Sequence, residues 1–172
     1  TQRRVGDALA RFRDSGGYML GICNGFQILT KLGLLPEGSL IDNVSGRFIC
    51  KWVSLNKNTD SSPFLKGLPD NFELPIAHAE GRFVAPQGLA DEYLENGLAA
   101  LLYKDDVNGS SCRIAGLTDK TGRVFGLMPH PERFLLESHH YDADWTRGEG
   151  GWGTGYHMFK SIFNEISERV SI

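Results

Sequence analysis

The fold is decided by one ten-residue stretch, Tyr18-Met19-Leu20-Gly21-Ile22-Cys23-Asn24-Gly25-Phe26-Gln27. Residues 18–22 form a short apolar run between glycines, which is typical of a strand buried on both faces of a parallel sheet. Apolar side chains then return at helical spacing from Phe26 until a Pro-Glu-Gly sequence at 36–38 ends the pattern. The stretch therefore predicts a buried strand, a sharp turn at Cys23 and a helix.

Patterning outside this stretch predicts the other elements. Apolar residues at helical spacing indicate an opening helix that ends at Gly16-Gly17 and a closing helix over 156–170. Short runs of β-branched and aromatic residues favour strands over 46–55, 74–78, 98–103, 111–118 and 124–128. Asn108-Gly109 is a strong hairpin signal between the third and fourth of these strands. The expected fold class is α/β, with helices around a mostly parallel sheet.

Composition excludes several classes of protein. The chain has 172 residues, of which 41% are hydrophobic and 23% charged, as in an ordinary globular domain. No apolar run approaches the roughly 18 residues of a membrane span, and a net charge of −3 with scattered Lys and Arg argues against a nucleic-acid partner. The odd number of cysteines, three, favours a reducing compartment. We expect one cytoplasmic domain over residues 1–172.

Cys23 stands between Gly21 and Gly25 at the predicted turn, in the cysteine form of a nucleophile elbow. Such a reversal strains the nucleophile and brings backbones together, so only small flanking residues are expected to fit. We expect the helix N-terminus to favour the thiolate of Cys23, and the backbone N–H of Asn24 to stabilise an oxyanion. The alternative is a small apolar cysteine in the core.

A second segment, Gly126-Leu127-Met128-Pro129-His130-Pro131-Glu132-Arg133, follows another buried strand. Functional sites of open α/β sheets gather at the carboxyl ends of the strands, so His130 is expected at the same edge as Cys23. His130 could then act as the base for Cys23, and Glu132 could orient its imidazole. The alternative is an ordinary loop histidine.

Gly21 to Gln27 together with His130-Pro131-Glu132 resembles the class I (triad) glutamine amidotransferases. Within that family, the stretches 46–53, 76–83 and 126–133 resemble the glutaminase subunits of phosphoribosylformylglycinamidine synthases. The resemblance implies a doubly wound, flavodoxin-like fold and hydrolysis of glutamine through a cysteinyl thioester. It also implies delivery of ammonia to a large ATP-dependent synthase subunit in purine biosynthesis, often with a small bridging subunit. ATP and Mg are then expected on the synthase, and no cofactor in this chain.

Residue by residue, the resemblance makes Cys23 the nucleophile, His130 the base, Glu132 its orienter and Gln27 a contact of the substrate. Gln27 lies one turn beyond Cys23, where its amide could bond a bound glutamine, or it is a solvated helix residue. A further segment resembles one that the family places near the site and the synthase interface, and its polar residues are His78, Glu80 and Arg82. A solvated loop is an equally compatible interpretation of these residues.

Two departures from the family pattern bear on these expectations. We expect additional N-terminal residues upstream of Thr1, with a Gly-rich loop that supplies a second oxyanion N–H and with the first strands of the sheet. The stretch Ser138 to Trp145 resembles an insertion and is expected to be a lid or a partner-facing loop. Its adjacent histidines, His139 and His140, point apart, so we predict no metal site.

The leading hypothesis is a glutaminase that supplies ammonia to a synthase. Another triad hydrolase of the same fold, such as a γ-glutamyl peptidase, is a second hypothesis. A non-catalytic regulatory module that retains the elbow is a third.

Overall fold

The computed structural model describes residues 2–142, 144 and 149–170. Its α-helices are α1 (Gln2–Asp14), α2 (Asn24–Lys31), α3 (Leu89–Glu95) and α4 (Thr154–Val170). Its strands are β1 (Met19–Ile22), β2 (Ser39–Asp42), β3 (Ile49–Lys57), β4 (Asn71–His78), β5 (Glu80–Val84), β6 (Ala99–Tyr103), β7 (Ile114–Thr118) and β8 (Val124–Leu127). Short 3₁₀ turns are η1 (Ser111–Arg113), η2 (Pro131–Arg133), η3 (Glu137–His139) and η4 (Glu149–Gly151).

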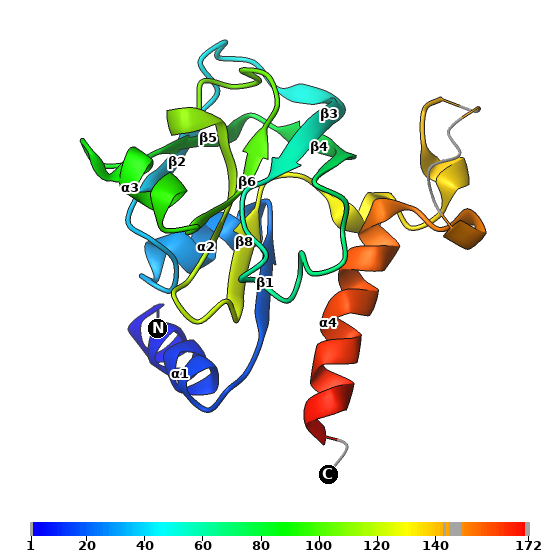
Figure 1. Cartoon of the computed structure of the whole chain (residues 1–172). Coiled ribbons are helices and arrows are strands. Elements are labelled where there is room, and N and C mark those ends of the chain that lie inside the picture. The colour runs from blue at the N-terminus through cyan, green and yellow to red at the C-terminus, as the bar shows by residue number, and fades with distance from the viewer. Residues whose placement is uncertain (1, 143, 145–148, 171–172) are drawn as a thin grey trace.

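Six of these strands form one curled sheet in the order β1-β8-β7-β6-β3-β4, and β2 pairs with β5 in a separate ribbon (Figure 1). The α/β class with helices around the sheet is confirmed. The mostly parallel pairing that we expected is wrong for the described strands: only β1 and β8 run parallel, and the other four neighbouring pairs are antiparallel. The connections explain this result, because no crossover helix of ordinary length joins β3 to β4 or β7 to β8.

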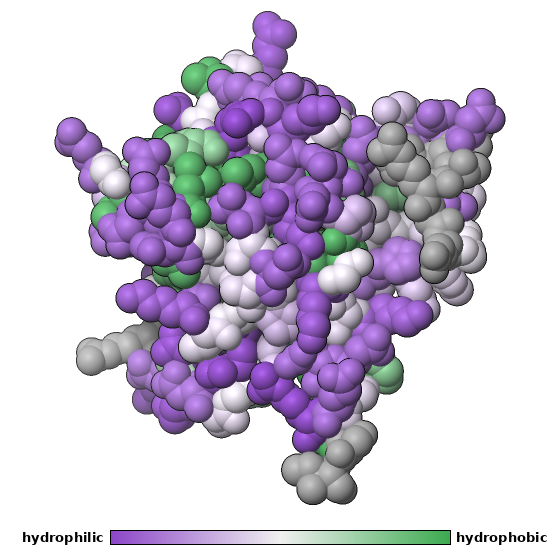
Figure 2. Space-filling model, viewed as in Figure 1, coloured by the Kyte–Doolittle hydropathy of each residue, from purple (hydrophilic) through white to green (hydrophobic). Residues whose placement is uncertain are grey.

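Strands β7 and β8, in the interior of the sheet, are buried on both faces, as the apolar runs predict. Alternate residues of β8 enter different cores: Phe125 and Leu127 pack in one with Met158 of α4, while Val124 packs in the other with Phe26 of α2. Figure 1 shows α4 on one side of β1 and β8, and α2 with α1 on the other. Two helical layers therefore hold the β1–β8 pair in place. Most of the surface facing the viewer in Figure 2 is hydrophilic.

The chain beyond β8 returns to the far edge of the sheet. Met128 N–H donates to Ala115 O at 3.0 Å, and His130 N–H donates to Pro75 O of β4 at 2.8 Å. Pro75 lies in the middle of β4 rather than near the start of the strand, where we expected it. Because β4 is the last strand of the sheet, the N–H that proline lacks breaks no ladder bond. The contact with Pro75 fixes the backbone of His130 against β4.

Several elements differ from the expected ones. β2, β5 and α3 were not predicted, and the strand expected over 111–118 begins only at Ile114, after the η1 turn. Cys112 and Arg113 have positive φ angles of 48° and 59°, which excludes extended backbone there. None of the helices in the described part of the chain combines the length and the apolar surface that crossing a bilayer requires.

Candidate active site

Cys23 occupies the turn between β1 and α2, with φ 51° and ψ −105°. A positive φ is rare for a residue with a Cβ and costs free energy, so it persists only where neighbouring structure enforces it. The enforcement comes from β8, because Cys23 N–H donates to Leu127 O at 2.8 Å and extends the parallel ladder by one bond beyond Ile22. The sequence thus correctly predicted a strained strand-to-helix turn at this position.

The two glycines of the elbow have different roles. A Cβ on Gly21 would lie 2.5 Å from a Leu29 methyl and 2.7 Å from the backbone carbonyl of Gly25, so the elbow requires glycine there. A Cβ on Gly25 would meet no described atom within 4 Å. The expectation that both flanking positions need small residues is therefore correct for Gly21 and wrong for Gly25.

Gly21→Ala should destabilise the fold by about 1–3 kcal/mol, because the added methyl group overpacks the elbow against backbone that cannot move away. Gly25→Ala is the matched control. It lies in the first turn of α2, where alanine costs less conformational entropy than glycine, and it should leave stability unchanged or raise it by up to about 1 kcal/mol. Urea unfolding of both variants measures the difference, and equal losses would contradict the close approach at Gly21.

The thiol of Cys23 is half-buried, and burial raises its pKa above the usual cysteine value. The backbone N–H of Asn24 and the charge of Arg133 act in the opposite direction, while Glu132 adds to the increase in pKa. Asn24 N–H, at the start of α2, favours the thiolate as expected, but burial has the larger effect on this pKa. Because burial raises the pKa of this thiol, formation of the thiolate depends on a base.

His130 is buried and has a carboxylate partner on the same turn. Its Nδ1 lies 2.6 Å from Glu132 Oε1, and η2 holds the two residues two positions apart with Pro131 between them. Because the carboxylate accepts, Nδ1 donates to it, and Nε2 is the ring nitrogen left to face a reacting group. That Nε2 has no hydrogen-bond partner among the described residues. A buried imidazole whose Nδ1 is held by a carboxylate and whose Nε2 is unpartnered has the geometry that a general base needs.

The parallel pair β1 and β8 brings these groups to one edge. Ile22, the last residue of β1, pairs with Leu127, the last residue of β8. Cys23 and the segment that leads to His130 therefore begin at the same edge of the sheet. The charges of Glu132 and Arg133 act on the Cys23 thiol, which puts the elbow and the η2 turn in one electrostatic environment. No hydrogen bond joins Cys23 to His130 among the described residues, and such contacts are often long before substrate binds.

Gln27 lies on α2 one turn beyond Cys23 and is half-buried rather than solvated. Its side-chain Nε2 donates to Glu80 O at 2.8 Å. This bond ties the elbow helix to the turn between β4 and β5, and it commits the amide nitrogen to the protein. This bond also orients the amide oxygen of Gln27, which can accept a hydrogen bond from a ligand.

The structure separates the three residues that we grouped as one coupling segment. His78 is 3% exposed at the end of β4, Glu80 is exposed, and Arg82 of β5 is half-buried with Nε donating to Gly109 O at 3.0 Å. Glu80 alone of the three is solvent-exposed, and it begins β5 rather than lying in a loop. His78 faces the interior, and burial together with the charge of His130 lowers its pKa to about 4.

Tyr103 is a site neighbour that the sequence did not reveal. Its phenol is fully buried in β6 without a hydrogen-bond partner among the described residues. Burial raises the pKa of Tyr103, and the negative charge of a Cys23 thiolate raises it further, which places the hydroxyl in the electrostatic field of the sulfur. A tyrosine at the end of an apolar strand carries no signal that distinguishes it from core packing.

The segment after the candidate base is anchored at His140 rather than free. His140 Nε2 lies 3.1 Å from Glu73 Oε2 of β4, and its ring packs 4.5 Å from that of Trp52. The expected lid over Ser138 to Trp145 lies partly outside the described residues, which omit 143 and 145. No group of three His, Cys, Asp or Glu side chains that could hold a metal gathers in the part of the chain that the structure describes.

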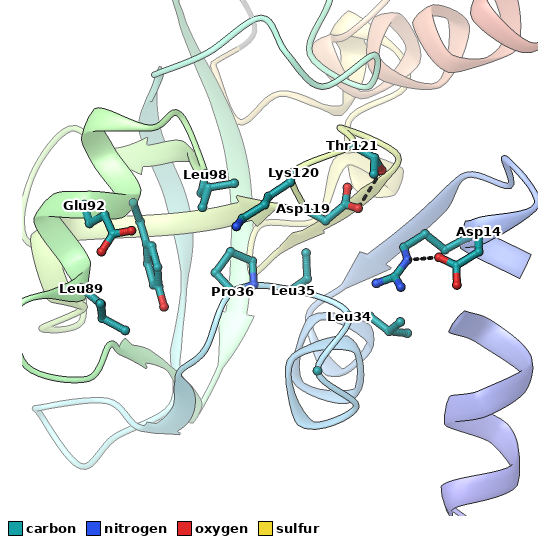
Figure 3. A pocket seen from close by; sticks show the side chains of 13 residues that line it. Asp14, Leu34, Leu35, Pro36, Leu89, Glu92, Leu98, Asp119, Lys120 and Thr121 are labelled. Atoms are coloured by element: carbon teal, nitrogen blue, oxygen red, sulfur yellow. Dashed lines mark hydrogen bonds and ion pairs between the residues drawn. The ribbon is translucent and has the colours of Figure 1, made fainter. Parts of the chain in front are cut away.

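A separate pocket of about 470 Å³ lies at the other end of α2, where Leu34, Leu35 and Pro36 face α3 and the β7–β8 turn (Figure 3). Charged side chains at its rim include Glu92, Asp119 and Lys120. Cys23 precedes α2, whereas this pocket follows it, so the pocket is not part of the candidate active site.

Residues 1–164 match the CobB/CobQ-like glutamine amidotransferase domain family. The phosphoribosylformylglycinamidine synthase subunit PurQ of Aquifex aeolicus is 44% identical over 149 residues, which cover 78% of this chain and 65% of that protein. PurQ of Zymomonas mobilis is 41% identical over 162 residues, covering 93% of this chain and 68% of that protein. The chain thus spans about two thirds of the length of these curated relatives.

Solved structures agree with this match. The structure of PurLQS from Thermotoga maritima superposes with a TM-score of 0.75 at 39% identity, over 94% of this chain and 68% of that chain. A second glutamine amidotransferase from Thermotoga maritima has a TM-score of 0.52 at 16% identity, over 98% of this chain and 56% of that one, and shares the fold alone.

Proposed function

This chain belongs to the CobB/CobQ-like glutamine amidotransferase family, and we propose that it is the glutaminase of a phosphoribosylformylglycinamidine synthase. One observation carries the proposal: a cysteine at a strained elbow, extending the ladder to Leu127, stands at the sheet edge where His130 is held by Glu132. A cysteine, a base and an orienting carboxylate are the parts that acyl transfer to sulfur needs.

In the proposed reaction, His130 Nε2 removes the proton from the Cys23 thiol and the sulfur attacks the γ-carbonyl carbon of glutamine. The carbonyl oxygen becomes an oxyanion that Asn24 N–H stabilises. The C–N bond then breaks, and His130 returns the proton to the leaving nitrogen, which departs as ammonia. Water, deprotonated by His130, hydrolyses the γ-glutamyl thioester to glutamate and restores the thiol. Glu132 stabilises the imidazolium in both halves.

Gln27 is proposed to hold the substrate, with its amide oxygen accepting from glutamine while its nitrogen stays on Glu80 O. The site residues are then Cys23, His130 and Glu132 for chemistry, Asn24 for the oxyanion and Gln27 for binding.

The ammonia is proposed to pass to a large ATP-dependent synthase subunit, with a small bridging subunit in the assembly. That partner would use ATP and Mg to convert formylglycinamide ribonucleotide to its amidine in the cytoplasm. The names of the relatives support this assignment, since they are subunits of that synthase and one structural neighbour is PurLQS. Glu80 and Arg82, near the β4–β5 turn that binds Gln27, are proposed to couple the subunits.

Glutamine hydrolysis should be slow in the chain alone and accelerate at least about fivefold when the synthase, ATP and its nucleotide substrate are added, which is the scale of ordinary coupling between sites. Glutamate release is measured with each component omitted in turn. Equal rates in all conditions would remove the ammonia-delivery proposal, and faster turnover of γ-glutamyl peptides than of glutamine would favour a free-standing peptidase.

A further inference from the structure

His78 is a buried histidine beside the candidate active site that the proposed reaction does not use. It ends β4, and its ring fills a slot that exists because residue 81 is glycine: a Cβ there would overlap the imidazole. Its Nδ1 lies 3.0 Å from Asn43 Oδ1, while its Nε2 is buried without a partner among the described residues. The ring is therefore held in one orientation with one nitrogen unused.

The hydrogen bonds of Asn43 determine which nitrogen carries the proton. Asn43 Nδ2 donates to Arg47 O at 2.8 Å and to His78 O at 2.9 Å, so its Oδ1 is the atom that faces the imidazole. An amide oxygen only accepts, so Nδ1 of His78 donates to it. The unused Nε2 consequently presents a lone pair. Because the pKa of His78 is lowered to about 4, this lone pair persists at neutral pH.

Two backbone contacts join the chain on either side of His78 to the base and to the elbow helix. Three residues before it, Pro75 O accepts from His130 N–H, and two residues after it, Glu80 O accepts from Gln27. The charge of His130 also acts on the His78 ring, so the two imidazoles share one environment. The neighbourhood thus contains two buried Nε2 atoms, one on each histidine, and no described group that hydrogen-bonds to either.

A buried acceptor without a donor is unfavourable, and it indicates a ligand that supplies the donor. At the reacting centre of glutamine, the carbonyl oxygen can only accept and is assigned to Asn24 N–H. The γ-amide nitrogen is the group there that donates. It has two N–H groups before the reaction and three when it leaves as ammonia.

Building on the proposed glutaminase function, we propose that His78 Nε2 accepts a hydrogen bond from the γ-amide nitrogen of glutamine and retains the ammonia that forms from it. In the tetrahedral intermediate the nitrogen becomes pyramidal. One N–H bonded to His78 fixes its rotation, so that its lone pair meets the proton on His130 Nε2. His78 transfers no proton itself, since its own N–H stays on Asn43. The C–N bond breaks, and the proton from His130 completes the ammonia.

The test compares two substrates in the assembled synthase: glutamine, and the γ-methyl ester of glutamate, whose leaving group has no N–H for His78. His78→Asn removes the Nε2 acceptor, and the shorter side chain still offers an N–H near the position of Nδ1. We expect the ratio of amide to ester turnover to fall about tenfold, the worth of one hydrogen bond. This ratio does not depend on the fraction of chains that fold.

His78→Gln is the matched control, since it can present an amide oxygen near the position of Nε2, and it should keep more of the wild-type ratio than His78→Asn. A ratio that stays at the wild-type value in His78→Asn, whether both rates fall or neither does, would overturn the contact with the leaving nitrogen. If the wild-type assembly hydrolyses both substrates, that result leaves the proposed glutaminase intact. Wild-type assembly that hydrolyses neither would overturn the proposed function, and this inference with it.

Discussion

Cys23→Ala should abolish glutamine hydrolysis, by at least about 10⁴-fold, because no thioester can form without the sulfur. The fold should persist, since alanine has the same Cβ as cysteine and adds no atoms to the elbow between β1 and α2. Glutamate release under saturating glutamine measures the activity, and far-UV circular dichroism with a urea midpoint measures the fold.

Cys50→Ala is the matched control for this variant. Cys50 is exposed on β3, away from the elbow, and its loss should leave turnover within about twofold of wild type, as surface substitutions generally do. Near wild-type hydrolysis by a folded Cys23→Ala protein would contradict the assignment of the nucleophile.

His130→Ala should lower turnover by about 10²–10⁴-fold, the usual worth of a general base. The loss is expected to be large because burial raises the pKa of the Cys23 thiol, so the sulfur depends on His130 for deprotonation. The loss of turnover in Glu132→Gln should be smaller than that in His130→Ala, by about tenfold or more. The amide oxygen of the new glutamine can still accept from Nδ1 and keep Nε2 free. Steady-state kinetics with glutamine compare the two variants.

The discriminating result is the order of the two losses. Equal losses in His130→Ala and Glu132→Gln would give Glu132 a more direct part in the chemistry than orientation of the imidazole. His140→Ala is a useful control for loss of a buried histidine, because His140 pairs with Glu73, packs on Trp52 and is assigned no role in the reaction.

The elbow and the His130–Glu132 pair could be predicted because their determinants are local. Glycine at position 21 is required by an atom four residues away, and the Nδ1–Oε1 contact joins residues two positions apart. The burial that raises the pKa of Cys23 could not be predicted because it is non-local: the surrounding fold buries the sulfur, and this outweighs the favourable N–H of Asn24.

The missed elements have weak local signals. β2 has four largely exposed residues, and α3 begins after Gly88, a residue in the left-handed region that makes no side-chain cap. The burial of His78 depends on Asn43, which is 35 positions away. No periodicity in the chain encodes that pair, so a histidine at a strand end was indistinguishable from a loop residue.

The contact between His130 and Pro75 also bears on how the molecule avoids self-association. In an antiparallel strand, the N–H and C=O groups of one residue point to the same side of the strand. The carbonyl of Pro75 bonds to His130 and not to β3, so Pro75 directs its backbone to the outer edge of β4. At that point proline offers no donor, and its carbonyl is already occupied. A strand from another molecule would find neither half of a ladder bond there, which discourages edge-to-edge aggregation. The backbone bond that positions the candidate base thereby also guards an open sheet edge.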